Sequence, residues 1–197
     1  MKKTFPILVL CLIVNIAIAQ KKQKVQEVVT QLYDLINYDG KTIPNFEATL
    51  NLFTEKAQMK WVMKDTVLSF TPKQFLSVIE NQIKQGVLKK AVEFEIDNQS
   101  QIFGNVAHFF SSYKTIVTTP NGENTRKGIN SIQLIKNKNK WKISSIAWFD
   151  ESEQYPLPNL LSESSSKDRK AVKTAALNYI ESIYEVDTTK LASISKN

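Results

Sequence analysis

The spacing of apolar residues predicts helices in the first half of the chain. In residues 22–37, "KQKVQEVVTQLYDLIN", apolar side chains recur every three or four positions and so share one side of a helix: Val25, Val28, Val29, Leu32, Leu35 and Ile36. Residues 45–53, "NFEATLNLF", repeat this spacing. Thr71 followed by Pro72 is typical of a helix start, because threonine caps free backbone amides and proline fits the first turn. That helix is expected to end at Gly86.

After Gly86 the apolar period changes to two, which predicts strands. In "AVEFEI", residues 91–96, apolar and acidic side chains alternate: Val92, Phe94 and Ile96 against Glu93 and Glu95. Longer strands are expected at 102–119, 127–136 and 140–149, with reversals at "TPNGEN" and "KNKNK". Helices followed by long strands indicate an α+β fold, in which helices pack on one face of a strongly curved antiparallel sheet (a cone or half-barrel), with an additional C-terminal helix.

Two of these strands are apolar on both faces. Residues 105–117, "NVAHFFSSYKTIV", and residues 141–149, "WKISSIAWF", place apolar side chains at odd and even positions alike. An antiparallel sheet with helices on one side normally shows a polar second face to water. Since this second face is apolar, a second subunit is the simplest cover for it, and a homodimer through the sheet is expected.

The N-terminus has the pattern of a signal peptide. Lys2 and Lys3 precede an apolar run, and "AIA" at 17–19 is a typical cleavage site. Cleavage after Ala19 would give an exported protein, periplasmic or secreted. The run is too short to cross a bilayer comfortably, so no membrane span is expected after cleavage. Cleavage also removes Cys11, the single cysteine, and with it any disulfide or thiol chemistry.

These patterns divide the chain into four parts: a signal peptide at 1–19, a main domain at 20–153, a linker at 154–168 and a helical segment at 169–197. The linker contains two prolines and a serine run, so few contacts across it are expected. The apolar stripe of the last segment repeats that of the first helix. This segment is therefore interpreted as a candidate truncated second unit.

Charge and composition exclude several kinds of site. The chain has a formal net charge of +7, and lysines cluster around the turn at 136–142. A solvated turn explains that cluster, and an exported protein seldom meets nucleic acid, so no nucleic-acid partner is expected. With one histidine and no cysteine after cleavage, no metal is expected. No glycine-rich phosphate loop is present in the sequence, and no cofactor is expected.

A few side chains are candidates for a site. His108 is the only histidine, and its ordinary pKa suits a general base. It is flanked by Ala107, Phe109 and Phe110, with no carboxylate nearby in sequence, so packing is the preferred interpretation. Asp150, at the end of the last strand, is a second weak acid–base candidate. The candidate ligand-binding residues are Trp61, Tyr33, Tyr113, Asn130 and Trp148.

Three segments carry a family resemblance: "LFTEKAQMKWV", "FGNVAHFFSSY" and "GINSIQLIKNKNKWKISSIAWFDE". Over about residues 22–152 the chain resembles exported bacterial members of the nuclear transport factor 2-like superfamily, the SnoaL-like cone-shaped α+β domains. The C-terminal "AVKTAALNYIESIYEVDTTKL" resembles the first helix of a lumazine-binding-like domain. The resemblance implies a pocket between helices and concave sheet, and commonly a dimer through the sheets. It implies no particular reaction, because function depends on the site.

The resemblance also tests one known mechanism. Ketosteroid isomerases of the superfamily use a carboxylate base, and alignment on Leu52, Phe53 and Ala57 places Trp61 at that position. An indole offers only an N–H donor, so it cannot act as a base. We therefore expect an exported small-molecule-binding or accessory protein whose pocket takes an apolar or aromatic ligand. Two alternatives stay open: a SnoaL-like isomerase or hydrolase using His108 or Asp150, and an interaction module whose pocket is filled by side chains.

Overall fold

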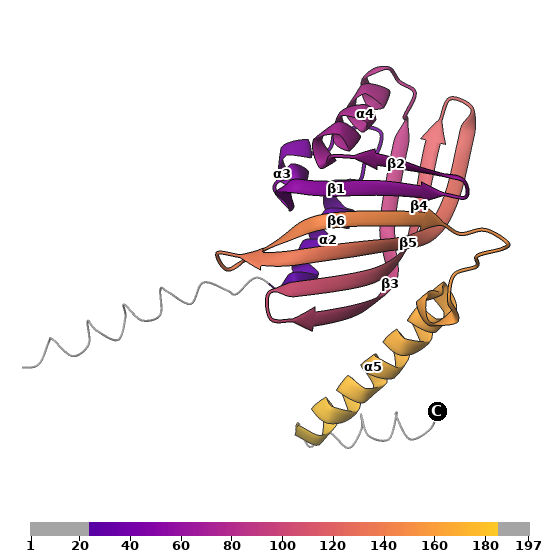
Figure 1. Cartoon of the computed structure of the whole chain (residues 1–197). Helices are drawn as coiled ribbons and strands as arrows, with labels where there is room; N and C mark the ends of the chain where they lie inside the picture. Colours follow the sequence, from indigo (N-terminus) through magenta and orange to yellow (C-terminus); the bar gives the residue numbers. More distant parts are fainter. Residues whose placement is uncertain (1–23, 185–197) are drawn as a thin grey trace, which may run out of the picture.

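The computed structural model describes residues 24–184, so the predicted signal peptide and residues 185–197 lie outside the described residues. The helices of the main body are α2 (Val25–Leu35), α3 (Phe46–Leu50) and α4 (Pro72–Lys84). The strands are β1 (Phe53–Met63), β2 (Thr66–Phe70), β3 (Lys90–Phe103), β4 (Val106–Thr119), β5 (Gly122–Asn137) and β6 (Lys140–Asp150). A short turn of helix, η1 (Asn159–Leu161), and α5 (Glu163–Tyr184) follow (Figure 1). The expected α+β class is confirmed.

The six strands form one sheet in the order β2-β1-β6-β5-β4-β3. Four neighbouring pairs are antiparallel, but β1 and β6 run parallel, so the sheet is mixed and not wholly antiparallel as expected. The reason is the length of the connection. Antiparallel neighbours are joined here by short turns, whereas α4 and four further strands separate β1 from β6, so no hairpin fixes their relative direction.

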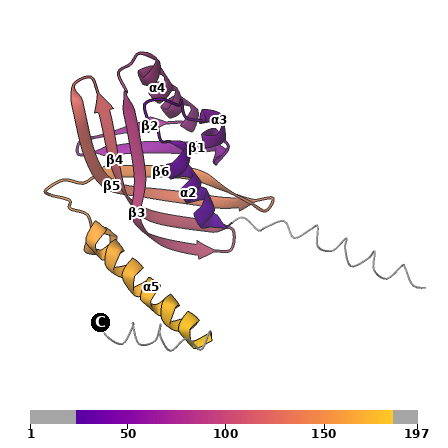
Figure 2. The same cartoon turned by 180° about the vertical axis from the view of Figure 1, so that it is seen from behind.

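The helices cover one face of the sheet. Figure 2 shows α2 lying across the strands, with α3 and α4 over the β1–β2 side. The apolar stripe of α2 packs on this face: Val28 and Val29 are fully buried, as are Ile132 of β5 and Ile143 of β6. Because strand side chains alternate between faces, the register of β4 places Phe109 on this helix-covered face and Phe110 on the opposite one.

The start of α4 follows its sequence signal. The Thr71 hydroxyl oxygen accepts a hydrogen bond from the backbone N–H of Gln74 at 3.2 Å, and the Gln74 side chain accepts from the backbone N–H of Thr71 at 2.9 Å. This reciprocal arrangement satisfies two amide groups that the helix leaves free. Pro72 occupies the first turn.

The segment predicted as a linker packs on the sheet. Leu161 is only 1% exposed, and its carbonyl oxygen accepts a hydrogen bond from the Ser112 hydroxyl at 2.7 Å. The Ser166 hydroxyl donates to the carbonyl oxygen of Ile96 at 2.9 Å. Ile96 sits at the irregularity of β3, where a residue falls out of register with β4 and its carbonyl is free to accept. Ser166, one of the serines that suggested a linker, therefore bonds to the sheet.

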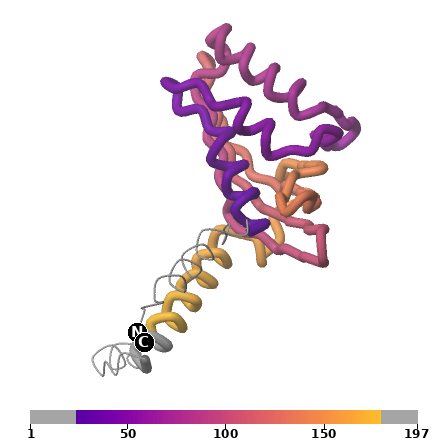
Figure 3. The backbone as a smooth tube through the Cα atoms, turned by 90° about the vertical axis from the view of Figure 1, so that its left-hand side faces the viewer, coloured from indigo at the N-terminus to yellow at the C-terminus, as the bar shows by residue number. Residues whose placement is uncertain are grey.

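Helix α5 begins at Glu163, six residues before the expected start of the C-terminal segment. Glu163 lies 3.3 Å from Lys127 and 3.7 Å from Lys114, and Arg169 pairs with Asp97. From residue 167 to residue 178 every side chain is exposed. Figure 3 shows the helix running away from the body formed by the sheet and the other helices. No helix within residues 24–184 is both long and apolar enough to span a membrane.

Candidate functional site

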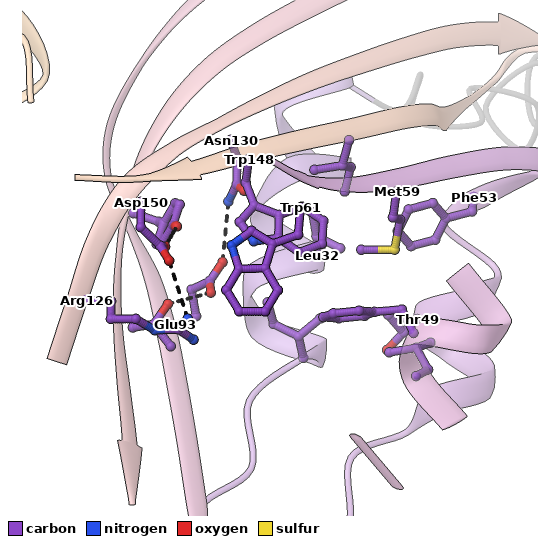
Figure 4. A pocket seen from close by; sticks show the side chains of 16 residues that line it. Leu32, Thr49, Phe53, Met59, Trp61, Glu93, Arg126, Asn130, Trp148 and Asp150 are labelled. Atoms are coloured by element: carbon purple, nitrogen blue, oxygen red, sulfur yellow. Dashed lines mark hydrogen bonds and ion pairs between the residues drawn. The ribbon is translucent and has the colours of Figure 1, made fainter. Parts of the chain in front are cut away.

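A cavity of about 140 Å³, partly open to solvent, lies between the helices and the concave face of the sheet. Figure 4 shows its two ends. Phe53, Met59 and Thr49 lie at one end, and Glu93, Arg126 and Asp150 lie at the other, with Trp61 between them. The cavity is thus apolar along much of its wall and carries its charged groups together.

Strand β3 turns the acidic side chain of Glu93 toward this cavity. The expected alternation is present: Glu93 faces the helices and lines the cavity, while Phe94 lies on the other face and is 41% exposed. Glu93 is held by donors from the neighbouring strands. Thr115 Oγ1 donates to one carboxyl oxygen at 2.6 Å, and Asn130 Nδ2 donates to the other at 3.4 Å.

Burial raises the pKa of Glu93 above its ordinary value of 4.5. The hydrogen bonds from Thr115 and Asn130 and the positive charge of Arg126 act in the opposite direction, and the charge of Asp150 adds to the rise. Glu93 was not among the candidates predicted from the sequence. The available signal was the set of polar residues that faces it, Thr115 and Asn130, on two strands otherwise rich in apolar residues.

Asp150 is the second carboxylate of the polar end. It accepts a hydrogen bond from the Tyr113 hydroxyl and lies 3.4 Å from the Arg126 guanidinium. Burial and the neighbouring Asp150 raise the pKa of Tyr113, so the phenol keeps its proton and remains a donor. Tyr113 fits because residue 128 is glycine: a Cβ there would lie 2.5 Å from the Tyr113 hydroxyl oxygen.

A chain of hydrogen bonds fixes Asn130 from behind. Asn130 Nδ2 donates to the Tyr33 hydroxyl at 3.0 Å, the Tyr33 and Ser111 hydroxyls are 2.8 Å apart, and Ser111 donates to Glu95 at 2.6 Å. Since the Ser111 proton goes to Glu95, the Tyr33 proton goes to Ser111. Burial raises the pKa of Tyr33, which keeps that proton in place. Tyr33 therefore orients a lining residue, without being one of the residues that line the cavity.

Aromatic rings form the central wall. Trp61 and Trp148 are stacked, with ring centroids 6.3 Å apart and an interplanar angle of 13°. Phe75 of α4 meets Trp148 edge-on at 5.6 Å, and the Arg126 guanidinium lies 5.6 Å from the centre of the Trp61 ring. The Trp61 Nε1 atom is buried and has no hydrogen-bond partner among the described residues.

His108 lies away from this site. It neighbours Phe109 in β4 and so points to the face opposite the helices, where its Nε2 is 3.1 Å from the Ser131 hydroxyl. It does not line the cavity, so the structure does not bring it together with Asp150. Of the candidates selected from sequence, five line the cavity: Trp61, Tyr113, Asn130, Trp148 and Asp150. Residues 24–184 contain no group of three or more histidine, cysteine or acidic side chains placed to hold a metal.

No protein-family model matches the chain, and no curated protein matches it. Solved structures do. A scytalone dehydratase candidate from Novosphingobium aromaticivorans is 11% identical with a TM-score of 0.53, over 65% of this chain and 82% of its own. A protein of unknown function from Mycobacterium tuberculosis is 14% identical with a TM-score of 0.52, over 84% and 89%. A hexachlorocyclohexane dehydrochlorinase of LinA type 3 from Novosphingobium barchaimii is 10% identical with a TM-score of 0.50, over 64% and 86%.

At such identities the likeness shows the fold alone. The chain therefore shares the fold of these neighbours, and its place in the nuclear transport factor 2-like superfamily stays an expectation from the sequence resemblance. The exported type and the lumazine-binding-like character of the C-terminal segment stay predictions.

Proposed function

We propose that this protein binds a compact small molecule, with an apolar or aromatic body, in the cavity between the helices and the sheet. The observation that carries the proposal is the inward-facing Glu93 in a cavity walled by aromatic rings. Ligand sites combine a mostly apolar wall with a few fixed polar groups, and here Glu93, Asn130 and Asp150 are fixed by their own hydrogen bonds. An open cavity also supports binding over a module whose pocket is filled by side chains.

The size of the cavity limits the ligand. A cavity of about 150 Å³ in a protein core holds one benzene ring, and this cavity measures about 140 Å³. A single ring therefore fits between the helices and the sheet, whereas a steroid-sized body would have to extend through the open side.

The test is a thermal-shift screen of single-ring compounds on the mature protein. A ligand at 100 times its Kd should raise the free energy of unfolding by about 2.7 kcal/mol. The matched control is Ile146→Phe, which adds volume to the cavity wall and should abolish the shift. A shift of equal size in the control would place binding elsewhere, and no shift with any ring would contradict the proposal.

A second candidate function is acid–base catalysis by Asp150 and Glu93, and the raised pKa of Glu93 in a cavity favours it. Two of the structural neighbours bear the names of a dehydratase and a dehydrochlorinase. Once a ligand is found, Glu93→Gln and Asp150→Asn distinguish the two functions. A fall in turnover beyond about a hundredfold with binding preserved would support an enzyme. Absence of turnover in the wild-type protein, with binding intact, would leave a binding protein.

We also propose that the protein is exported and that the predicted signal peptide is removed after Ala19. Intact-mass analysis of protein recovered from the medium or periplasm of an expressing bacterium should then give a chain that begins at Gln20. A cell-retained chain with its original N-terminus would contradict this proposal, while leaving ligand binding unaffected.

A further inference from the structure

The indole N–H of Trp61 is a donor without an acceptor inside the cavity wall. Its nitrogen is buried and unpaired among residues 24–184. Buried polar groups in folded proteins are nearly always hydrogen-bonded, so an exception at a cavity points to a group that the cavity receives. In Figure 4 the nitrogen edge of this ring faces the polar end, where Glu93 lies.

The described residues place no acceptor within hydrogen-bond distance of this nitrogen. Rotation of the indole would break its stacking on Trp148 and its contact with the Arg126 guanidinium. Both oxygens of Glu93 already accept hydrogen bonds, from Thr115 and Asn130, and both oxygens of Asp150 accept from Tyr113 and Arg126. The donor is therefore held in one orientation, and the carboxylates at the same end of the cavity are bonded to other donors.

We propose that the ligand is a neutral, planar single ring with a hydrogen-bond acceptor on its edge, and that this acceptor pairs with Trp61 Nε1–H. The inference rests on the proposed ligand-binding function and names its ligand class. The stacked indoles and the cavity volume select a flat single ring. Asp150 and Glu93, two carboxylates beside the single Arg126 guanidinium, disfavour an anion, and a protonated ring would have no lone pair left to accept from the Trp61 N–H.

Benzene and pyridine test this inference, because they have the same size and differ by one ring acceptor. Affinities are measured by calorimetry at pH 8, where pyridine is neutral, for the wild type, Trp61→Phe and the control Trp148→Phe. Trp61→Phe keeps an aromatic ring and removes the N–H. It should weaken pyridine binding about tenfold, the effect of one hydrogen bond at a buried donor, and change benzene binding by less than about twofold. Trp148→Phe should affect both rings alike.

A second measurement needs no variant. In the ¹⁵N-labelled wild type, the Trp61 indole N–H resonance should move downfield with pyridine and stay nearly unchanged with benzene. The inference is overturned if Trp61→Phe weakens both rings equally or neither, if benzoate binds more tightly than pyridine, or if the indole resonance does not move while both rings bind. In that last case an ordered water accepts the hydrogen bond from the Trp61 indole N–H. Failure of both rings to bind the wild type overturns the proposed function itself.

Discussion

At the scale of single residues, Glu93 links the site to the stability of the fold. Its pKa is raised in the folded protein, so above the ordinary value of 4.5 the folded state binds more protons than the unfolded state. The free energy of unfolding therefore falls as the pH rises from 4.5 through the raised pKa. Glu93→Gln removes this pH dependence, because glutamine does not titrate. Its neutral amide can still bond to Thr115 and Asn130.

We expect Glu93→Gln to gain stability relative to the wild type between pH 4.5 and pH 7.5. Urea denaturation at the two pH values gives the difference directly. The matched control is Glu123→Gln, at an exposed position near the start of β5, which should follow the wild type at both pH values. A Glu93→Gln curve parallel to that of the wild type would show that Glu93 does not titrate as its burial requires.

Gly128 makes room for the Tyr113 side chain. A methyl group at residue 128 would lie 2.5 Å from the Tyr113 hydroxyl oxygen and also meet the carbonyl oxygen of Phe149. We expect Gly128→Ala to lower the free energy of unfolding by about 1–3 kcal/mol, the usual cost of overpacking, and to weaken ligand binding. Tyr113→Phe serves as the comparison, because it removes the bond to Asp150 without crowding the backbone. A free energy of unfolding equal to that of the wild type in Gly128→Ala would mean that the strands shift to accommodate the methyl group without loss of stability.

His108 is expected to be dispensable for the site, because its side chain points away from the cavity. His108→Gln keeps a polar group near Ser131 and should leave ligand affinity, and any turnover, within about threefold of the wild type, well below the hundredfold or more expected for a general base. Titration of the variant with the best ring from the screen measures this. A loss of turnover beyond about a hundredfold would mean that His108 takes part in the reaction.

At the scale of elements, the segment at 159–166 behaves as part of the sheet domain. Leu161 is 1% exposed, whereas its neighbour Leu160 is 61% exposed. Replacing a buried leucine by alanine costs about 2–5 kcal/mol. Leu161→Ala should therefore lower stability by an amount in this range, and Leu160→Ala should change it little. Chemical denaturation of the pair measures the difference, and equal stabilities would mean that the segment does not pack as described.

Truncation separates this segment from the exposed part of α5. A chain that ends at residue 169 keeps Leu161 and Ser166 on the sheet and should melt close to the full-length protein. A chain that ends at residue 159 loses both and should melt well below it, because their contacts with Ser112 and Ile96 are lost. Equal melting temperatures for the two chains would support the linker that the sequence suggested.

The positions of the helices and strands along the chain were easier to predict from the sequence than the face that each strand turns to the helices. Apolar spacing locates α2 and the Thr71–Pro72 pair locates α4, since both signals are local. Alternation located β3 but did not show which of its faces points to the helices. That depends on two hydrogen-bond donors that lie far along the chain, Thr115 and Asn130. The same dependence explains why Glu93 was missed. Aromatic and polar lining residues were found because they interrupt otherwise ordinary strands.

At the scale of the whole molecule, an apolar patch is exposed on the convex face of the sheet. The side chains of Phe110, Val106 and Ile135 on this face are 38%, 53% and 39% exposed. We propose that two copies pair through it. Phe110→Glu should convert the dimer to a folded monomer in size-exclusion chromatography with light scattering. Val78→Glu, at an apolar position of α4 that is 47% exposed, is the control and should stay dimeric. A monomeric wild type at high micromolar concentration would contradict the pairing.

The parallel pairing of β1 with β6 sets the order in which the molecule can fold. β6 is the last strand along the described chain, yet it lies in the middle of the sheet, between β1 and β5. Until residue 150 is available, the β1–β2 hairpin and the β3–β5 strands are two separate halves. The bond from Asn130 to Tyr33 spans 97 residues, and such non-local contacts slow folding. Synthesis from the N-terminus thus leaves the sheet open until β6 has been made, which is consistent with the export that we propose.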